Sequence, residues 1–217
     1  MSMSRKKSIV AIIIIIGVAI AAIFPYVTLH PANSRIALNG SFPLHYTVLM
    51  IHIATAFVAL VSGLFQFHSA LRTKYPARHR ALGRIYVYSV MLSGLLGLVL
   101  TFYADSFTKA LAFLALSLLW LLTTWKGFRY AVKGQMTEHR SWMIRSYAVT
   151  LVATTARVIV PVCILLYLAF HGFQLPSGGR EQMIAEILDV NVWIGLLVNL
   201  LVVEWIILRP TPRRYPK

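Results

Sequence analysis

The sequence predicts an all-α membrane protein in which six helices cross the bilayer. The chain of 217 residues is 59% hydrophobic and only 12% charged, its mean hydropathy is +0.73, and its apolar residues gather in six long runs. A soluble domain usually has about 25% charged residues. Because so much apolar surface is unfavourable in water, we expect it to face lipid, in a single integral membrane domain spanning residues 1–217.

Each apolar run is long enough to cross a bilayer, since about 20 helical residues span the hydrocarbon core. We expect the helices at residues 8–29, 44–66, 82–103, 108–131, 143–170 and 187–208. The first run resembles a signal peptide, but its apolar core from Ile9 to Phe24 exceeds the usual ~7–15 residues, so we interpret it as a retained helix. Residues 181–189 are expected to form a separate, short interfacial helix.

The basic residues predict the orientation. Most of the 21 Lys and Arg residues lie on one side of the predicted helices, and the exceptions are Arg35, Lys109, Arg157 and Arg180. Loops rich in Lys and Arg stay in the cytoplasm, so both termini are expected there, in a bacterial cytoplasmic membrane. The formal net charge of +15 therefore indicates topology and contact with anionic lipid head groups, and not a nucleic-acid partner.

Two segments of the chain echo each other. The segment from His79 to Tyr86 opens the third helix, and the segment from His139 to Tyr147 opens the fifth. Each contains a His-Arg pair, a second Arg, and a Tyr two residues later. Basic residues are expected at any inner boundary, whereas matched His and Tyr residues are not. We infer that helix pairs 2–3 and 4–5 are parallel repeats.

Arg157 indicates a polar interior. It lies 12 positions after Arg145, or about 18 Å along a helix, which predicts a place near the middle of the membrane. A guanidinium there costs at least ~2.5–3.5 kcal/mol if it faces lipid. Pro161 also leaves the carbonyl of Arg157 without its helical donor. We expect Arg157 to face inward, and the alternative is a structural arginine held by helix carbonyls.

Polar and small residues recur on one face of the second, third and fifth helices, at the spacing of a helical stripe. This predicts a central bundle of helices 2–5, flanked by helices 1 and 6. The interior polar site that we expect consists of His52, Gln66, Tyr86, Thr154 and Arg157.

Three histidines at the inner boundary are candidate ligands. Two imidazoles on facing helices suit a haem iron, and three suit a zinc or copper ion. The candidates are His68, His79 and His139, and the arginines expected to pair with haem propionates are Arg80, Arg84, Arg140 and Arg145. The alternative is that these residues bind lipid phosphates. Glu204 is expected to pair with a cation such as Arg209, and no motif of a hydrolase occurs.

These residues resemble a bacterial family of multi-pass membrane proteins called domain of unknown function 2306, over roughly residues 44–160. The resemblance rests on Leu49–His52, Gly63–Phe67, His79–Tyr86, His139–Tyr147 and Arg157. It implies a helical membrane domain and no particular activity. The chain also bears a looser likeness to four-helix haem proteins of the b561 type, which use His pairs in a central bundle.

Three functions are compatible with the sequence, and whether any of them is enzymatic stays open. We favour a cytoplasmic-membrane redox protein with a b-type haem or a metal at His79 and His139 and a quinone near Arg157. The second function is a transporter or binder of a small anion, with Arg157 as the counter-charge. The third is a non-enzymatic factor that organises lipid or assists a membrane protein partner.

Overall fold

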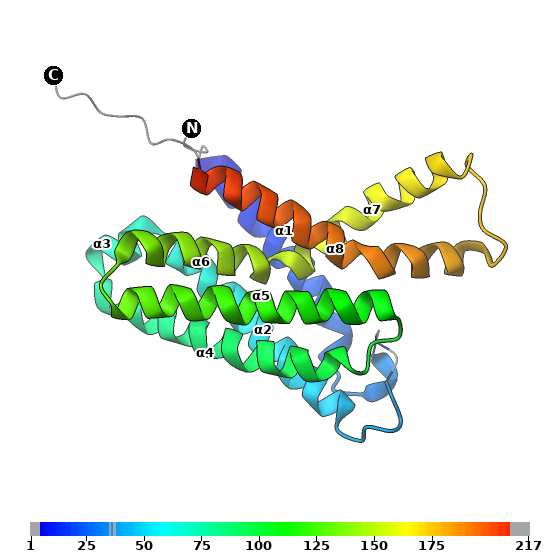
Figure 1. The fold of residues 1–217 in the computed structure, drawn as a ribbon, viewed down its shortest axis with the longest axis horizontal. Coiled ribbons are helices and arrows are strands. Elements are labelled where there is room, and N and C mark those ends of the chain that lie inside the picture. The colour runs from blue at the N-terminus through cyan, green and yellow to red at the C-terminus, as the bar shows by residue number, and fades with distance from the viewer. Residues whose placement is uncertain (1–4, 35, 37, 209–217) are drawn as a thin grey trace.

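A computed structural model describes residues 5–34, 36 and 38–208, and every regular element in them is helical (Figure 1). The helices are α1 (Arg5–Ile23), α2 (His45–Gln66), α3 (Ser69–Lys74), α4 (Pro76–Thr101), α5 (Phe107–Val132), α6 (Met136–Thr150), α7 (Val152–Phe170) and α8 (Gly179–Leu208), with short 3-10 turns at Phe24–Tyr26 and Pro31–Asn33. Six helices are long and apolar enough to cross a membrane. The predicted all-α, polytopic membrane fold is confirmed.

Several helix boundaries differ from the predicted ones. The third predicted helix begins at Pro76 and the fifth at Met136, because their first turns are rich in His and Arg and so do not register as apolar. The fifth predicted helix is two helices, α6 and α7, separated at Leu151. Residues 181–189 do not form a separate helix but belong to α8. Arg35 and the basic residues in 209–217, Arg209 among them, lie outside the described residues.

Helices α2, α4, α5 and α6 form the central bundle (Figure 1). Helix α4 lies between α2 and α5, and α6 packs along α5. The buried residues that join these helices include Ala59, Tyr86, Trp120 and Tyr147. The predicted bundle therefore uses α6 alone from the fifth segment, because α7 diverges from the bundle and pairs with α8, as Figure 1 shows.

The close packing of α2 in the bundle depends on Gly63. A Cβ atom at Gly63 would lie 2.5 Å from the ring of Tyr147 and 2.9 Å from the ring of Tyr86. Both distances are shorter than any side chain tolerates, so only glycine admits the two aromatic rings at this crossing.

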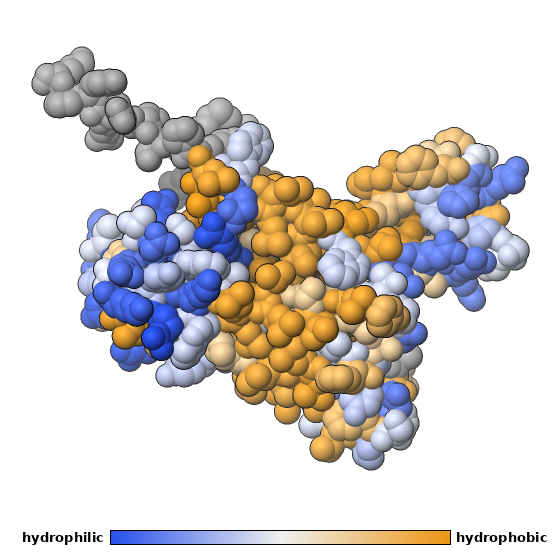
Figure 2. Space-filling model, in the orientation of Figure 1, coloured by the Kyte–Doolittle hydropathy of each residue, from blue (hydrophilic) through white to orange (hydrophobic). Residues whose placement is uncertain are grey.

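The surface has the pattern of a membrane protein. On the face that Figure 2 shows, a broad apolar belt covers the middle of the helices, and a hydrophilic end covers α3 and the connection between α5 and α6. The exposed leucines Leu111, Leu118 and Leu122 recur at helical spacing on α5 and mark one lipid-facing stripe of the belt. The described ends of α1 and α8 lie toward the same hydrophilic end in Figure 1, as the loop charges predict.

Candidate functional site

His79 and His139 come together at the hydrophilic end of the bundle. His79 lies in the first turns of α4 and His139 in the first turn of α6, and the two imidazoles are close enough to interact electrostatically. Arg72 and Arg80 also lie near His79. Both rings are half-buried. The structure thus brings together the histidine pair that the repeat predicted, and adds Arg72 of α3 to it.

Hydrogen bonds determine which ring nitrogens are available. The Nδ1 atom of His139 lies 2.8 Å from the carbonyl oxygen of Gly127. Because a carbonyl oxygen only accepts, Nδ1 carries the proton and donates it, and the Nε2 atom of a neutral ring keeps a free lone pair. The Nδ1 atom of His79 is buried and has no hydrogen-bond partner among the described residues. Gln66 holds the backbone of His79, because its Nε2 donates to the His79 carbonyl at 3.2 Å.

The four arginines expected around this pair differ in availability. Arg80, Arg84 and Arg140 are exposed at the same end of the bundle. Arg145 instead donates two hydrogen bonds to Glu204 of α8, from Nε to Oε1 and from Nη2 to Oε2, the second at 2.8 Å. Its guanidinium also lies 5.0 Å from the centre of the Trp142 ring. Arg145 is therefore engaged, which corrects its expected role as a partner of haem propionates, and the cation that Glu204 was expected to pair with is Arg145.

The expected three-histidine metal site is not formed. His68 is exposed before the first turn of α3. Within residues 5–34, 36 and 38–208, no group of three His, Cys, Asp or Glu side chains is arranged to hold a metal ion. The pair of His79 and His139 is what remains of the predicted ligands.

Arg157 is exposed on α7, so the expectation that it faces the interior is wrong. Its Nη1 atom donates to the carbonyl of Ala153 one turn earlier, at 2.6 Å. Neighbouring contacts place it near the outer end of the bundle. Asn191 of α8 donates to the carbonyl of Ala156 at 3.5 Å, and Trp193, two residues later, donates to the carbonyl of Thr108 in the first turn of α5.

Contacts of α6 show how far Arg157 lies from the middle of α5. The indole of Trp120, near the middle of α5, donates to Thr150, so Thr150 lies level with the middle of that helix. Arg157 is seven residues further along the chain, about 10 Å of helix toward the outer surface. An arginine at that depth can extend its side chain to the head groups, which removes the cost of facing lipid.

The remaining residues of the predicted interior site are inside the bundle but do not form one site. The Nδ1 atom of His52 lies 2.9 Å from the carbonyl oxygen of Ser93, which fixes α2 against α4. Gln66 is engaged with the backbone of His79. Thr154 is buried near the start of α7. Only Tyr86 belongs to an extended polar cluster.

That cluster is a chain of hydroxyl groups at the centre of the bundle. The Tyr86 hydroxyl lies 2.7 Å from that of Ser146 and 2.8 Å from that of Thr150, and the Thr124 hydroxyl lies 2.6 Å from that of Ser146. Trp120 donates to Thr150 at 2.9 Å. Tyr86 belongs to the predicted interior site, and Ser146 and Thr150 lie on the polar stripe predicted for the fifth helix, whereas Trp120 and Thr124 were missed. The signal for them was a stripe of small and polar residues on α5, which are Ser117, Trp120, Thr124 and Gly127.

Only one arrangement of the four hydroxyl protons satisfies all the contacts. Thr150 also lies 3.0 Å from the backbone carbonyl of Ser146, which can only accept, so Thr150 donates there. Tyr86 must then donate to Thr150, Ser146 to Tyr86, and Thr124 to Ser146. The chain has one direction, every member is satisfied, and no group is left to bind a ligand.

The matched residues of the two predicted repeats meet in pairs. The rings of Tyr86 and Tyr147 have centroids 6.4 Å apart, and His79 and His139 lie close together nearer the hydrophilic end. Two pairs of equivalent residues that each lie near one another are what an approximate two-fold axis along the bundle would produce. This supports the repeat, and it places the histidine pair beside that axis.

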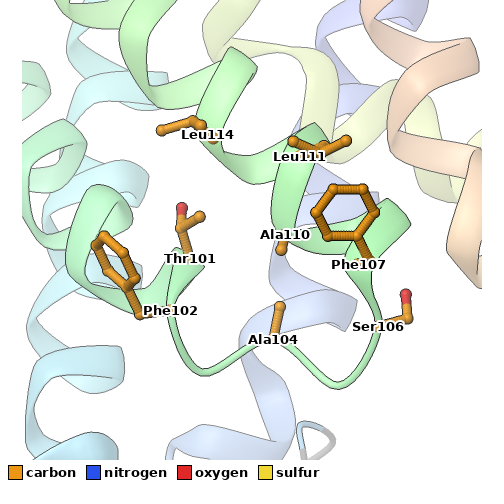
Figure 3. Close-up of a pocket in the computed structure, with 8 residues that line it drawn as sticks. All are labelled: Thr101, Phe102, Ala104, Ser106, Phe107, Ala110, Leu111 and Leu114. Atoms are coloured by element: carbon orange, nitrogen blue, oxygen red, sulfur yellow. The ribbon is translucent and has the colours of Figure 1, made fainter.

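A hollow of about 300 Å³ lies elsewhere, at the outer turn between α4 and α5 (Figure 3). Its lining is mostly apolar and includes Phe102, Phe107, Leu111 and Leu114. None of the residues predicted to bind a ligand lines it. The histidine pair, at the opposite end of the bundle, is therefore the candidate functional site.

Comparison with known proteins identifies the family to which the chain belongs. Neither a curated protein nor a solved structure matches the chain. The model of the family described as "Predicted membrane protein (DUF2306)" matches residues 49–207, which include α4, α5, α6 and α7 entirely and nearly all of α2 and α8. This match covers most of the chain, the histidine pair and the hydroxyl chain included. The protein therefore belongs to the DUF2306 family of membrane proteins.

Proposed function

We propose that this protein is a redox protein of the bacterial cytoplasmic membrane that holds a b-type haem between His79 and His139. The observation that carries the proposal is that these two imidazoles lie in the first turns of α4 and α6, at the same end of the bundle and near enough to interact electrostatically. The hydrogen bond from His139 to the carbonyl of Gly127 supports it, because it orients the ring and leaves Nε2 for an iron ion.

The number of protein ligands favours haem over a protein-bound zinc or copper ion. A haem supplies four nitrogen ligands itself and needs one or two axial ligands from the chain. A zinc site built by the protein needs three or four side chains. The described residues offer a pair of imidazoles and no group of three ligands, so the donor set fits haem.

The charges around the pair also fit a haem. Haem carries two propionates, which arginine binds well because its guanidinium forms two parallel hydrogen bonds with a carboxylate. Arg80 and Arg140 each follow one of the histidines directly and are exposed, so they are available for this role. When bound, the haem would supply one-electron chemistry, and the chain would supply the axial ligands and the compensating charge.

The other two functions have less support than haem binding. A small-anion transporter, or a quinone site in the interior, needed Arg157 inside the bundle, and its side chain is exposed on α7. A membrane-soluble quinone remains a suitable redox partner by chemical class, without an assigned site. A role in organising lipid does not compete with haem binding, because it uses other residues.

The test is the absorption spectrum of the detergent-purified protein with a haem determination. We expect one haem b per chain, with a spectrum typical of two histidine ligands. His79→Ala and His139→Ala should each lose that spectrum. His68→Ala is the matched control, because His68 lies at the same end of the bundle but is exposed and outside the pair, and it should keep the haem.

Gel filtration and thermal unfolding of each variant separate loss of haem from loss of fold. A wild-type protein that is colourless after expression with ample haem precursor would contradict the proposal. So would a folded His79→Ala or His139→Ala variant that retains the full haem content and spectrum.

A further inference from the structure

The lipid-facing stripe of α5 ends in charge at the hydrophilic end of the bundle. Below Leu118 and Leu122, the same stripe continues through Trp125 and Arg129, both of which are exposed. Their intervals of four, three and four residues follow the helical period. Arg129 therefore points in the same direction as leucines that face acyl chains, at the depth where α5 leaves the membrane.

Two cations lie over indole rings at the end of this stripe. We call this region the corner, and it consists of Lys126 and Arg129 with the indoles of Trp125 and Trp142. The guanidinium of Arg129 lies 5.5 Å from the centre of the Trp125 ring, and the Nζ atom of Lys126 lies 4.3 Å from the centre of the Trp142 ring on α6. Lys126 and Arg129 are three residues apart, so their side chains lie on neighbouring positions of one helix face. The indoles hold both cations in place and leave their outward side open.

No carboxylate neutralises these two charges. Glu204, the acid on the adjoining helix α8, is engaged by Arg145. Neither Lys126 nor Arg129 forms an ion pair within the described part of the chain. The guanidinium of Arg145 also lies near Trp142, 5.0 Å from the centre of its ring. The corner carries two uncompensated positive charges at the membrane boundary.

We propose that this corner binds one anionic phospholipid of the inner leaflet, with its phosphodiester between Lys126 and Arg129. The proposal is independent of haem binding. The source of the phosphate is a lipid and not a free anion, because the cations continue a stripe that faces acyl chains. Trp125 and Leu122 then pack against the glycerol and the upper acyl chain, as tryptophan does at membrane interfaces.

The test is native mass spectrometry of the full chain with added phosphatidylglycerol, compared with added phosphatidylcholine. We expect wild type to retain one phosphatidylglycerol molecule and to bind it more tightly than phosphatidylcholine. Lys126→Gln with Arg129→Gln should weaken phosphatidylglycerol binding about thirty-fold, as expected for the loss of two charges at a lipid surface. The matched control is Lys74→Gln with Arg78→Gln, an exposed lysine and an exposed arginine at the same end but on α3 and α4, away from this site, and it should bind like wild type.

Inorganic phosphate distinguishes the two sources of the anion. If millimolar phosphate leaves the bound phosphatidylglycerol in place, the lipid source stands, and if phosphate displaces it, the site is one for a free anion. Equal retention by wild type and by the Lys126 and Arg129 double variant would overturn the proposal. Equal loss in the control variant would overturn it as well, since binding would then follow total charge. Thermal midpoints in phosphatidylcholine should match among all three proteins, which excludes misfolding as the cause.

Discussion

At the scale of single residues, the centre of this protein is polar but uncharged. The hydroxyls of Tyr86, Ser146, Thr150 and Thr124 satisfy one another and are buried in the bundle. Burying a hydroxyl without a partner in hydrocarbon costs several kcal/mol, so each member depends on its neighbours. The chain therefore fixes how α4, α5 and α6 align, because sliding one helix by a residue would leave partners unmatched.

Tyr86→Phe tests this dependence. The change removes the acceptor of Ser146 and a donor to Thr150, so we expect a loss of about 1–2 kcal/mol in the free energy of unfolding. Unfolding in mixed micelles with increasing denaturant measures it. Tyr88→Phe is the control, since Tyr88 lies on the same helix and its side chain is 70% exposed. Equal stability of the two variants would show that the hydroxyl chain contributes nothing.

Gly63→Ala tests the packing of α2. The added Cβ would lie 2.5 Å from the ring of Tyr147, which Tyr86 and Phe67 flank, so we expect the helices to separate and the unfolding free energy to fall by about 1–3 kcal/mol. Gly17→Ala in α1 is the control, because nothing lies within 4 Å of its added Cβ and alanine favours a helix. A Gly63→Ala protein as stable as wild type would contradict the close contact.

At the scale of helices, the interruption between α6 and α7 has a cause on α8. Asn199 donates from Nδ2 to the carbonyl of Ala148, three residues before the interruption, at 2.9 Å, and accepts a hydrogen bond from Thr155 just after it. Gly195, one turn earlier on α8, lets that helix approach, since an added Cβ there would lie 3.1 Å from the backbone nitrogen of Ala156. Helix α8 thus supports the point at which α7 diverges from the bundle.

Asn199→Leu should weaken this joint. The variant loses both hydrogen bonds around Leu151, and interhelical hydrogen bonds in membranes contribute about 0.6 kcal/mol on average and at most about 1.7. We expect a loss of unfolding free energy in that range. Asn191→Leu, two turns earlier on the same face, should lose less because the bond from Asn191 to Ala156 is long, at 3.5 Å. A larger loss from Asn191→Leu would reverse the assigned importance of the two residues.

At the scale of the whole molecule, the charges predict which end faces the cytoplasm. Lys133, after α5, lies at the hydrophilic end, whereas Phe173, between α7 and α8, lies at the other end and is 77% exposed. With buried Cys163 replaced by Ser, we expect Phe173→Cys to react with a membrane-impermeant maleimide from outside intact cells. Lys133→Cys should react only after the cells are opened. The opposite pattern would invert the topology.

The sequence predicted the features that depend on neighbouring residues along the chain. Apolar runs marked the membrane helices, stripes marked the inward faces, and the echo around His79 and His139 marked two residues that lie at the same end of the bundle. It did not predict contacts set by distant residues. Asn199 bonds to residues on both sides of the interruption at Leu151, and Arg145 is engaged by Glu204, 59 residues later. The inward direction expected of Arg157 was wrong for a related reason, since the exposure of its side chain depends on how α7 packs against distant helices.

The single direction of the hydroxyl chain has a consequence for proton movement. A row of hydroxyls conducts protons repeatedly only if every hydroxyl can reverse the direction of its hydrogen bond after each proton transfer. Here Trp120 can only donate to Thr150 and the carbonyl of Ser146 can only accept from it, so both contacts fix the row at its Thr150 end. Reversing the row would break the bond from Thr150 to that carbonyl, so we expect this part of the bundle to conduct protons poorly.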